Sequence, residues 1–294
     1  MSNKDAGQKV VNILPDHRTL CFRALITLGM KLISARDRFF VRIDSLPATD
    51  HSIPITIESS HNRSLQAIFH ATSSSPQAGV LILHGIGDRL VYWANAQHLL
   101  DEEGFTSLIV HYAGYGQSTG PITPDNLRAD IHTAYAHLRT LLPAHTPVFV
   151  LGFSMGTGAL ADVANLLAPR PAGIILCQPF TSLRAAAARI VTPLLARLLP
   201  DLWPTAKTLR LLPSPLLIVH TDADPLLPLS MAKEIEAQAA TQSLYPVTLA
   251  VPAGFGHNDV YLNPRKGYWT PILDFLRWHA APATDKPDTA PIPD

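Results

Sequence analysis

The sequence predicts an α/β protein with a mostly parallel, eight-stranded sheet flanked by helices. Six short runs consist almost wholly of apolar residues, as is typical of strands that are buried on both faces. Segments with helical periodicity separate most of these runs, and such alternation indicates a parallel sheet. Of the 294 residues, 47% are hydrophobic and 16% are charged, so the chain can bury a large core beneath a lightly charged surface.

The strands and helices follow one another in a regular order. Strands are expected at residues 53–57, 64–69, 80–83, 107–110, 148–151, 173–176, 215–219 and 247–251, and a last helix at 269–276. A helix is also expected over residues 90–103, and Gly104 should end it. Another should begin near Thr123, which can cap its first turn, with Pro124 and Asp125 favoured at the positive end of the helix dipole.

The chain divides into three parts by composition. Residues 1–46 are expected to form an N-terminal helical segment and residues 47–280 the α/β domain. Residues 281–294 are rich in proline, threonine and aspartate, so a disordered tail is expected. The interval 180–213 is longer than a crossover helix requires. It is interpreted as a lid inserted over the site, the alternative being an ordinary crossover with a kinked second helix.

Residues 20–33 are apolar but are interrupted by Arg23 and Lys31. This stretch is too short and too charged for a helix that spans a membrane, and it lacks the features of a signal peptide. A helix packed on the protein is the simpler interpretation. The alternative is a helix lying on a membrane surface, because apolar side chains sit there among basic ones. The sequence thus predicts a cytoplasmic protein, either free or associated with a membrane through residues 20–33.

The composition argues against several classes of partner. The 23 basic and 23 acidic residues balance, and no basic run is present, so nucleic acid is not an expected ligand. Two cysteines make no disulfide framework, which fits a reducing compartment. Neither a metal-ligand pattern nor a dinucleotide-binding glycine motif stands out, so no metal and no cofactor are expected.

The pentapeptide from Gly152 to Gly156 is the strongest functional motif. It reads Gly-Phe-Ser-Met-Gly and lies between the strand at 148–151 and a helix rich in small residues. A strand, G-x-S-x-G and a helix form a nucleophile elbow, in which a tight turn exposes the serine hydroxyl. The pattern therefore predicts Ser154 as a nucleophile that attacks an acyl carbon.

A serine nucleophile needs a base, and the base needs a carboxylate to orient it. Asp222 and Asp224 both follow the strand at 215–219, and Asp224 is preferred because the turn brings it back over the strand end. Capping of a turn is the alternative role for either aspartate. Among 13 histidines, His257 stands out because it follows the last strand on a loop that contains two glycines. Ser154, Asp224 and His257 are the predicted catalytic residues.

The backbone N–H groups of Met155 and Ile86 are the predicted oxyanion hole, Met155 opening the elbow helix and Ile86 lying on the loop after the strand at 80–83. His84 is expected to be structural, with its ring tied into that loop. Apolar side chains near these positions predict an apolar acyl substrate, with core packing as the alternative for each of them. The predicted substrate-binding residues are Phe153, Phe180, Leu226, Leu227 and Phe255.

Taken together, these motifs resemble the α/β-hydrolase superfamily from about residue 53 to residue 278. The segments 179–184, 111–118 and 257–259 are similar to those of bud-emergence-protein-like and depalmitoylase-like hydrolases. This resemblance implies cleavage of an ester or thioester, including lipid-like ones, by Ser154, Asp224 and His257. His111 and Ala113 replace the Asp and Arg of that branch's D-x-R-G motif, so its local ion pair should be missing. Amidase or peptidase activity, and a non-catalytic binding role, are the alternatives.

Overall fold

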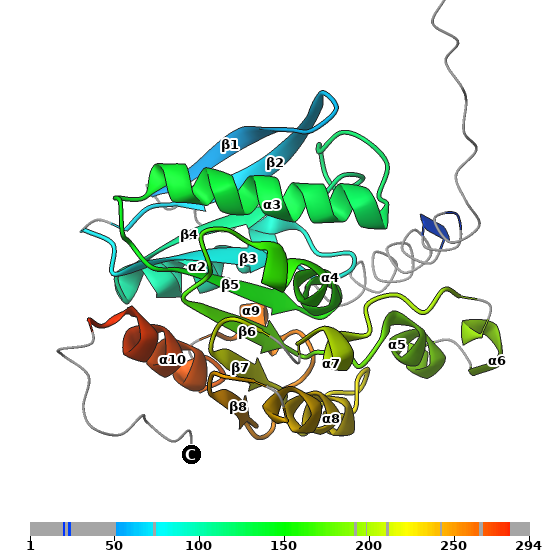
Figure 1. The fold of residues 1–294 in the computed structure, drawn as a ribbon. Helices are drawn as coiled ribbons and strands as arrows, with labels where there is room; N and C mark the ends of the chain where they lie inside the picture. Colours follow the sequence, from blue (N-terminus) through cyan, green and yellow to red (C-terminus); the bar gives the residue numbers. More distant parts are fainter. Residues whose placement is uncertain are drawn as a thin grey trace, which may run out of the picture.

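An eight-stranded sheet forms the centre of the protein, with the strands in the spatial order β1-β2-β4-β3-β5-β6-β7-β8 (Figure 1). β2 is antiparallel to both of its neighbours, β1 and β4, whereas the pairs from β4 to β8 are parallel. The strands are β1 Ser52–Ser59, β2 Arg63–His70, β3 Ala78–Leu83, β4 Phe105–Val110, β5 Val148–Phe153, β6 Gly173–Cys177, β7 Leu216–Val219 and β8 Val247–Ala250. The mostly parallel eight-stranded sheet predicted from the sequence is confirmed.

A computed structural model describes residues 51–72, 75–190, 193–197, 199–209, 212–241, 243–264 and 267–282, together with Leu20, Arg23 and Ala24. The helix expected over 20–33 lies outside the described residues, except for those three. The tail expected from residue 281 lies outside them beyond Pro282. Among the described residues, no helix has both the length and the apolar character required to cross a membrane.

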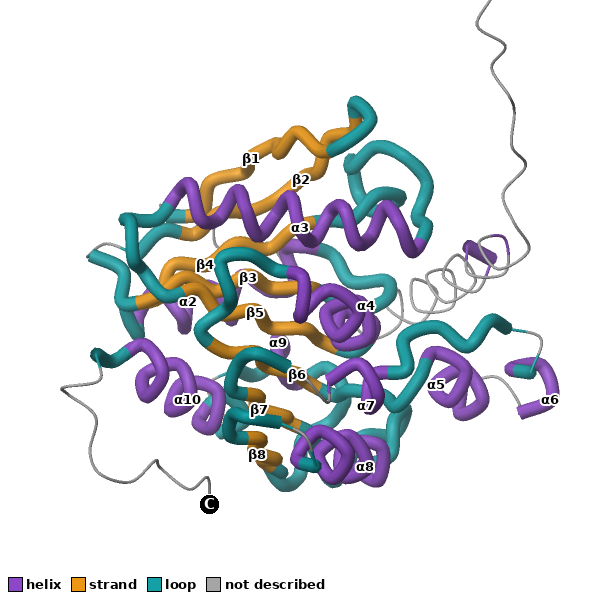
Figure 2. The backbone as a smooth tube through the Cα atoms, viewed as in Figure 1, coloured by secondary structure: helices purple, strands orange, loops and turns teal. Residues whose placement is uncertain are grey.

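Helices cover both faces of the sheet and enclose a separate apolar core on each (Figure 2). One face packs against α3 Pro124–Leu141, α4 Met155–Val163 and α8 Leu229–Ala240. The other packs against α2 Ala94–Glu102, α9 Asp259–Leu262 and α10 Thr270–Ala280. Strands β3 to β7 are buried along their whole length, because each lies between these two helical layers.

Local sequence determines where the helices begin and end. The Oγ1 atom of Thr123 accepts a hydrogen bond from the Asn126 N–H at 3.1 Å, and this caps α3 as predicted. The helix expected over 90–103 begins instead with the 3₁₀ turn η1 Leu90–Trp93 and continues as α2. A second 3₁₀ turn, η2 Ala164–Leu166, extends α4.

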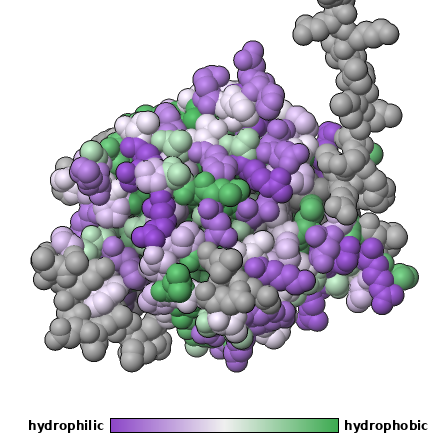
Figure 3. Space-filling model, in the orientation of Figure 1, coloured by the Kyte–Doolittle hydropathy of each residue, from purple (hydrophilic) through white to green (hydrophobic). Residues whose placement is uncertain are grey.

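On the face that α3, α4 and α8 cover, hydrophobic side chains are scattered among polar ones (Figure 3).

Among its described residues, the interval between β6 and β7 contains three short helices, α5 Leu183–Ile190, α6 Pro193–Ala196 and α7 Thr205–Thr208. They lie at the end of the sheet where β5 leads into α4 (Figure 1). Trp203, just before α7, is buried and packs against Phe180, with 6.4 Å between the ring centroids. This segment is therefore anchored to the body of the protein close to the elbow.

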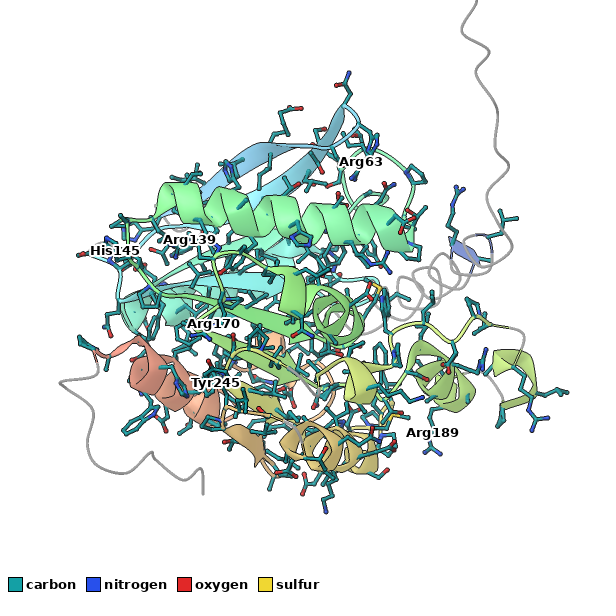
Figure 4. The ribbon with its side chains drawn as sticks, in the orientation of Figure 1. Arg63, Arg139, His145, Arg170, Arg189 and Tyr245 are labelled. Carbon is teal, nitrogen blue, oxygen red and sulfur yellow. The ribbon has the colours of Figure 1, made fainter. Side chains whose placement is uncertain are left out.

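A buried ion pair holds the β1–β2 hairpin against α3. The Arg63 guanidinium bonds the Asp130 carboxylate, and Figure 4 shows Arg63 where the hairpin turn meets the loop that leads into α3. The other oxygen of Asp130 accepts the Ala113 N–H at 2.8 Å. The local ion pair expected to be missing at positions 111 and 113 thus has a counterpart, in which Arg63 and Asp130 come from elsewhere in the chain.

Candidate active site

Ser154 occupies a sharp turn between β5 and α4. Its φ of 48° and ψ of −115° lie in a region that residues with a side chain rarely adopt. The Ser154 N–H donates to the Cys177 carbonyl at 2.9 Å, and the Ser154 carbonyl accepts from the Thr157 N–H at 2.9 Å and the Thr157 hydroxyl at 2.6 Å. These bonds hold the strained residue in place at the start of α4.

The glycines on either side of Ser154 are required by close backbone contacts. A Cβ atom at Gly152 would lie 2.7 Å from the Gly156 carbonyl oxygen. A Cβ atom at Gly156 would lie 2.1 Å from the Leu83 carbonyl oxygen and 2.9 Å from that of His84. The first turn of α4 therefore rests directly on the end of β3, which only glycine permits.

We expect Ser154→Gly to be more stable than Ser154→Ala by about 1 kcal/mol. Alanine keeps the unfavourable φ, whereas glycine relieves a strain of about 1–3 kcal/mol and loses part of that gain through the flexibility of its unfolded chain. Urea unfolding of both variants measures the difference. Equal stabilities would show that the turn is unstrained.

His257 lies between Ser154 and Asp224. The distance from His257 Nε2 to Ser154 Oγ is 3.1 Å, and that from His257 Nδ1 to Asp224 Oδ2 is 2.6 Å. The second oxygen of Asp224 accepts the N–H groups of Leu226 at 2.7 Å and Leu227 at 3.0 Å. A continuous chain of hydrogen bonds thus runs from two backbone N–H groups through Asp224 and His257 to the serine hydroxyl.

The Asp224 carboxylate stays ionised although its side chain has no exposed surface. Burial is the largest single influence and raises the pKa of Asp224. The hydrogen bond and charge of His257, together with the two backbone N–H groups, outweigh it and bring the pKa below its ordinary value. Asp224 can therefore accept the His257 Nδ1–H and favour the tautomer whose Nε2 is free to take a proton.

Two further aspartates hold the loop that carries His257. Asp222 accepts the Gly254 N–H at 2.8 Å, and Asp259 accepts the Gly256 N–H at 2.7 Å. Asp222 thus links the loop after β7 to the loop after β8, while Asp224 contacts the histidine. Of the two aspartates that the sequence offered as partner of His257, Asp224 lies beside the ring and Asp222 does not.

The loop after β3 is held beside the first turn of α4. Asp88 accepts the Gly85 N–H at 2.9 Å and the Trp93 indole N–H at 3.3 Å, which fixes the loop on either side of Ile86. Met155 is the first residue of α4, so its N–H has no partner within the helix. The two N–H groups predicted as an oxyanion hole therefore belong to backbone segments in direct contact at Gly156.

Comparisons with known proteins agree with this fold. The sequence model of the family described as serine aminopeptidase, S33, matches residues 74–214. The structure resembles that of the esterase Pf2001 of Pyrococcus furiosus, with a TM-score of 0.64 and 19% identity over 81% of this chain and 94% of that one. The chain has the α/β-hydrolase fold. The sequence match and the structural similarity both support this fold.

Two curated relatives match parts of this chain. Protein ABHD12B of Homo sapiens is 31% identical over 188 residues, which are 56% of this chain and 51% of that protein. Lysophosphatidylserine lipase ABHD12 of Gallus gallus is 23% identical over 242 residues, which are 73% of this chain and 62% of the relative. The chain therefore spans about half to two thirds of the length of these relatives.

A pair of buried histidines lies behind the loop that follows β3. His84 Nδ1 donates to the Gly85 carbonyl at 2.7 Å, so its Nε2 must accept the bond from His111 Nδ1 at 3.2 Å. Tyr112 donates its hydroxyl to the His84 carbonyl at 3.1 Å. His84 is thus tied into the loop as expected, and His111 supports it.

Both histidines are neutral at physiological pH. Burial, aided by the neighbouring His111, lowers the pKa of His84 to about 3. Burial, aided by the charge of Arg89, lowers the pKa of His111 to about 4. Each ring is expected to take up a proton on unfolding below about pH 6.5. The folded state of the protein therefore loses stability as the pH falls from about 6.5 towards 4.

We expect His111→Asn to flatten this dependence by up to about 1.4 kcal/mol per pH unit, the contribution of one proton. Asparagine can still donate to His84 Nε2 but does not titrate. Free energies of unfolding in urea between pH 7 and pH 5 measure the slope for both proteins. Parallel slopes would mean that His111 does not titrate on unfolding.

Sequence analysis missed the side chain that joins the ends of β6 and β7. Gln178 donates its amide to the Thr221 hydroxyl at 2.9 Å, and its carbonyl accepts the Thr221 N–H at 3.1 Å. Thr221 lies two residues after the end of β7, and its side chain gives Gln178 a partner. A buried glutamine directly after a strand is the signal that could have revealed this contact.

The predicted substrate-binding residues divide by burial. Phe153, Phe180 and Leu227 are buried, with exposed fractions of 1–3%. The Phe153 ring lies 5.1 Å from the His257 ring and also packs on Trp93, so it supports the histidine from the side of the core. Leu226 and Phe255 are half-buried and adjoin the loops of Asp224 and His257. Burial favours a packing role for the first three and leaves Leu226 and Phe255 accessible.

Proposed function

We propose that the protein is a serine hydrolase that cleaves carboxylic ester or thioester bonds of an apolar acyl substrate through an acyl-enzyme intermediate. One observation carries the proposal: His257 bridges Ser154 Oγ at 3.1 Å and Asp224 Oδ2 at 2.6 Å, and Ser154 itself lies at a turn with a strained backbone. Strain at a buried turn is costly, and it is typical of sites where geometry serves catalysis.

In this mechanism Ser154 Oγ attacks the carbonyl carbon while its proton passes to His257 Nε2. Asp224 holds the imidazole through Nδ1–H and stabilises the imidazolium that forms. The negative charge that develops on the carbonyl oxygen is stabilised by the N–H groups of Met155 and Ile86. The His257 proton then goes to the leaving alkoxide or thiolate. Water, activated by the same histidine, releases the carboxylic acid.

The side chains near the triad support an ester or thioester rather than a peptide as substrate. An aminopeptidase requires a carboxylate to bind the substrate ammonium group, and the family description makes this the second candidate function. Asp88, Asp222 and Asp259 each already accept a loop N–H group. Leu226 and Phe255, by contrast, offer accessible apolar surface suited to an acyl chain.

The proposed substrate is lipid-like, in keeping with the lipase named among the relatives. We place the chain near the bud-emergence-protein-like and depalmitoylase-like branch. In its 111–118 motif the Ser118 hydroxyl donates to the His111 carbonyl at 2.7 Å and accepts the Gln66 N–H at 2.9 Å.

A cytoplasmic location with membrane contact through residues 20–33 belongs to the same proposal. Sedimentation with liposomes in the absence of detergent tests that contact.

A fluorophosphonate probe tests the serine mechanism, because it reacts with an activated serine. We expect the full chain to be labelled and Ser154→Ala to be unlabelled, whatever the natural substrate. A non-catalytic binding protein would not be labelled at all. Labelling that persists in Ser154→Ala would assign the nucleophile to another residue.

A series of p-nitrophenyl esters tests the acyl specificity. We expect kcat/KM to increase from acetyl to octanoyl, because a longer chain buries more apolar surface against Leu226 and Phe255. The corresponding amide substrates measure the aminopeptidase alternative. A preference for acetyl over octanoyl, or for the amides, would overturn the apolar ester assignment.

A further inference from the structure

Two histidines and an aspartate meet at the end of the sheet opposite Ser154. His51 precedes β1, His70 ends β2, and Asp101 lies in the last turn of α2. Asp101 Oδ2 is 3.0 Å from His51 Nδ1 and 3.2 Å from His70 Nε2. We propose that these three side chains form a binding site for a divalent transition-metal ion, with Zn²⁺ as the ion that fits them best.

The spacing of the three atoms matches that of ligands around zinc. Zinc–nitrogen and zinc–oxygen bonds of roughly 2.0–2.2 Å in a tetrahedron place neighbouring ligand atoms about 3.4 Å apart. Both measured distances to the carboxylate are within a few tenths of an ångström of that value. The three candidate ligand atoms all lie within 4.8 Å of one another, so a modest approach of His51 to His70 completes the geometry.

The ligands combine a rigid part and an adjustable part. The side chains of His70 and Asp101 are 1% and 10% exposed, so packing fixes them, whereas His51 is 45% exposed and can move. In the register of the sheet, His70 is paired with both Ser52 and Ser107, so it is held by strands on both sides. The movement required for metal binding therefore falls on His51, at low cost.

The hydrogen bonding of His70 favours metal binding through its Nε2 atom. His70 Nδ1 bonds the Ser52 hydroxyl at 2.8 Å, so this nitrogen can keep the proton while Nε2 faces the metal. Imidazole nitrogens with one carboxylate suit zinc better than magnesium or calcium, which prefer sets of oxygen ligands.

The position of the site indicates a structural role. His51 and His70 belong to the β1–β2 hairpin at the edge of the sheet. Asp101 belongs to α2, which packs on the face of the sheet opposite to α3. Figure 1 shows the start of β1 and the end of β2 on the side of the sheet away from the junction of β5 and α4. A bound ion would thus cross-link the hairpin to α2, far from the proposed serine chemistry.

Zinc binding to the metal-free full chain tests this inference, by competition with a chromophoric chelator. We expect one equivalent to bind in the micromolar range or tighter. We expect binding to weaken about tenfold or more in His51→Ala, whose exposed side chain can be removed without unfolding the protein. His137→Ala, on α3, serves as a matched control that removes an imidazole elsewhere.

Thermal unfolding gives a second readout that does not depend on catalysis. Zinc should raise the unfolding temperature of the wild type and of His137→Ala, because the ion binds the folded state. It should have little effect on His51→Ala or on Asp101→Asn. Equal affinity and equal thermal shifts in all four proteins would place the zinc elsewhere, for example at His257. Absence of micromolar binding in the wild type would show a hydrogen-bonded network only.

Discussion

Asp224→Asn is expected to lower kcat for ester hydrolysis by about 10⁴-fold, whereas Asp222→Asn should leave it within a few-fold of the wild type. The two aspartates are two residues apart on one loop and each accepts a backbone N–H. Asp224 alone of the two bonds His257. The pair therefore separates orientation of the histidine from support of the loop.

The expected loss follows from the way Asp224 is held. The N–H groups of Leu226 and Leu227 both donate to Oδ1, so an asparagine at this position will keep its carbonyl oxygen towards them. Its NH₂ group then faces His257 Nδ1 and donates to it. The imidazole is forced into the tautomer that carries its proton on Nε2, which cannot accept the Ser154 proton.

Asp222→Asn lacks this effect because its amide oxygen can still accept the Gly254 N–H. Steady-state kinetics with a p-nitrophenyl ester, alongside circular dichroism to verify folding, measures both variants. Comparable losses in the two would mean that the loop as a whole, rather than the contact with His257, determines activity. An Asp224→Asn protein within tenfold of the wild type would remove Asp224 from the proposed triad.

Much of the fold could be predicted because its determinants are local. Strands β3, β5, β6 and β7 are apolar throughout, since both faces of the sheet are covered, and that pattern is visible in a run of four residues. The placing of Ser154, Asp224 and His257 together also followed from local patterns. Each lies on the turn or loop that follows a strand, and the carboxyl ends of parallel strands share one edge of the sheet.

The features that were not predicted depend on contacts between distant segments. Arg63 pairs with Asp130 across 67 positions, and Gln178 meets Thr221 across 43. The cluster of His51, His70 and Asp101 spans 50 positions and carries no spacing motif of its own. In such cases the sequence shows the chemical groups, but only the register of the sheet brings them together.

The burial of Phe153, Phe180 and Leu227 follows the same logic. The sequence shows that they adjoin the site residues, but a side chain next to a catalytic residue can point either towards the substrate or into the core. The alternation of a strand decides between the two. Phe153 ends β5 and points into the core on the α2 and α10 face, where it packs on Trp93 and Tyr261. It affects the site by supporting His257.

Gly156→Ala is expected to destabilise the protein by about 3 kcal/mol or more, the largest stability effect we anticipate in the chain. The added Cβ would lie 2.1 Å from the Leu83 oxygen, 2.8 Å from the Leu83 carbonyl carbon and 2.9 Å from the His84 oxygen. All three are backbone atoms at the end of a central strand, so no side-chain rotation can relieve the collision. α4 must move away from β3.

Gly158→Ala and Gly256→Ala provide graded controls for this prediction. At Gly158, also within α4, the nearest atoms are the Phe180 and Trp203 rings at 2.7 and 2.9 Å, and these side chains can shift. Both helical substitutions gain about 1 kcal/mol of helix propensity, so their difference isolates the collision with the backbone. At Gly256 a Cβ would meet Asp259 Oδ2 at an ordinary 3.7 Å.

Urea unfolding should therefore rank the variants with Gly156→Ala least stable, Gly158→Ala intermediate and Gly256→Ala close to the wild type. The same displacement of α4 would carry Met155 away from Ile86, so any folded Gly156→Ala protein should also label poorly with a fluorophosphonate. A Gly156→Ala protein as stable as Gly158→Ala would contradict the close contact between α4 and β3. The oxyanion hole would then lose the physical basis proposed for it, because that contact is what brings its two N–H groups together.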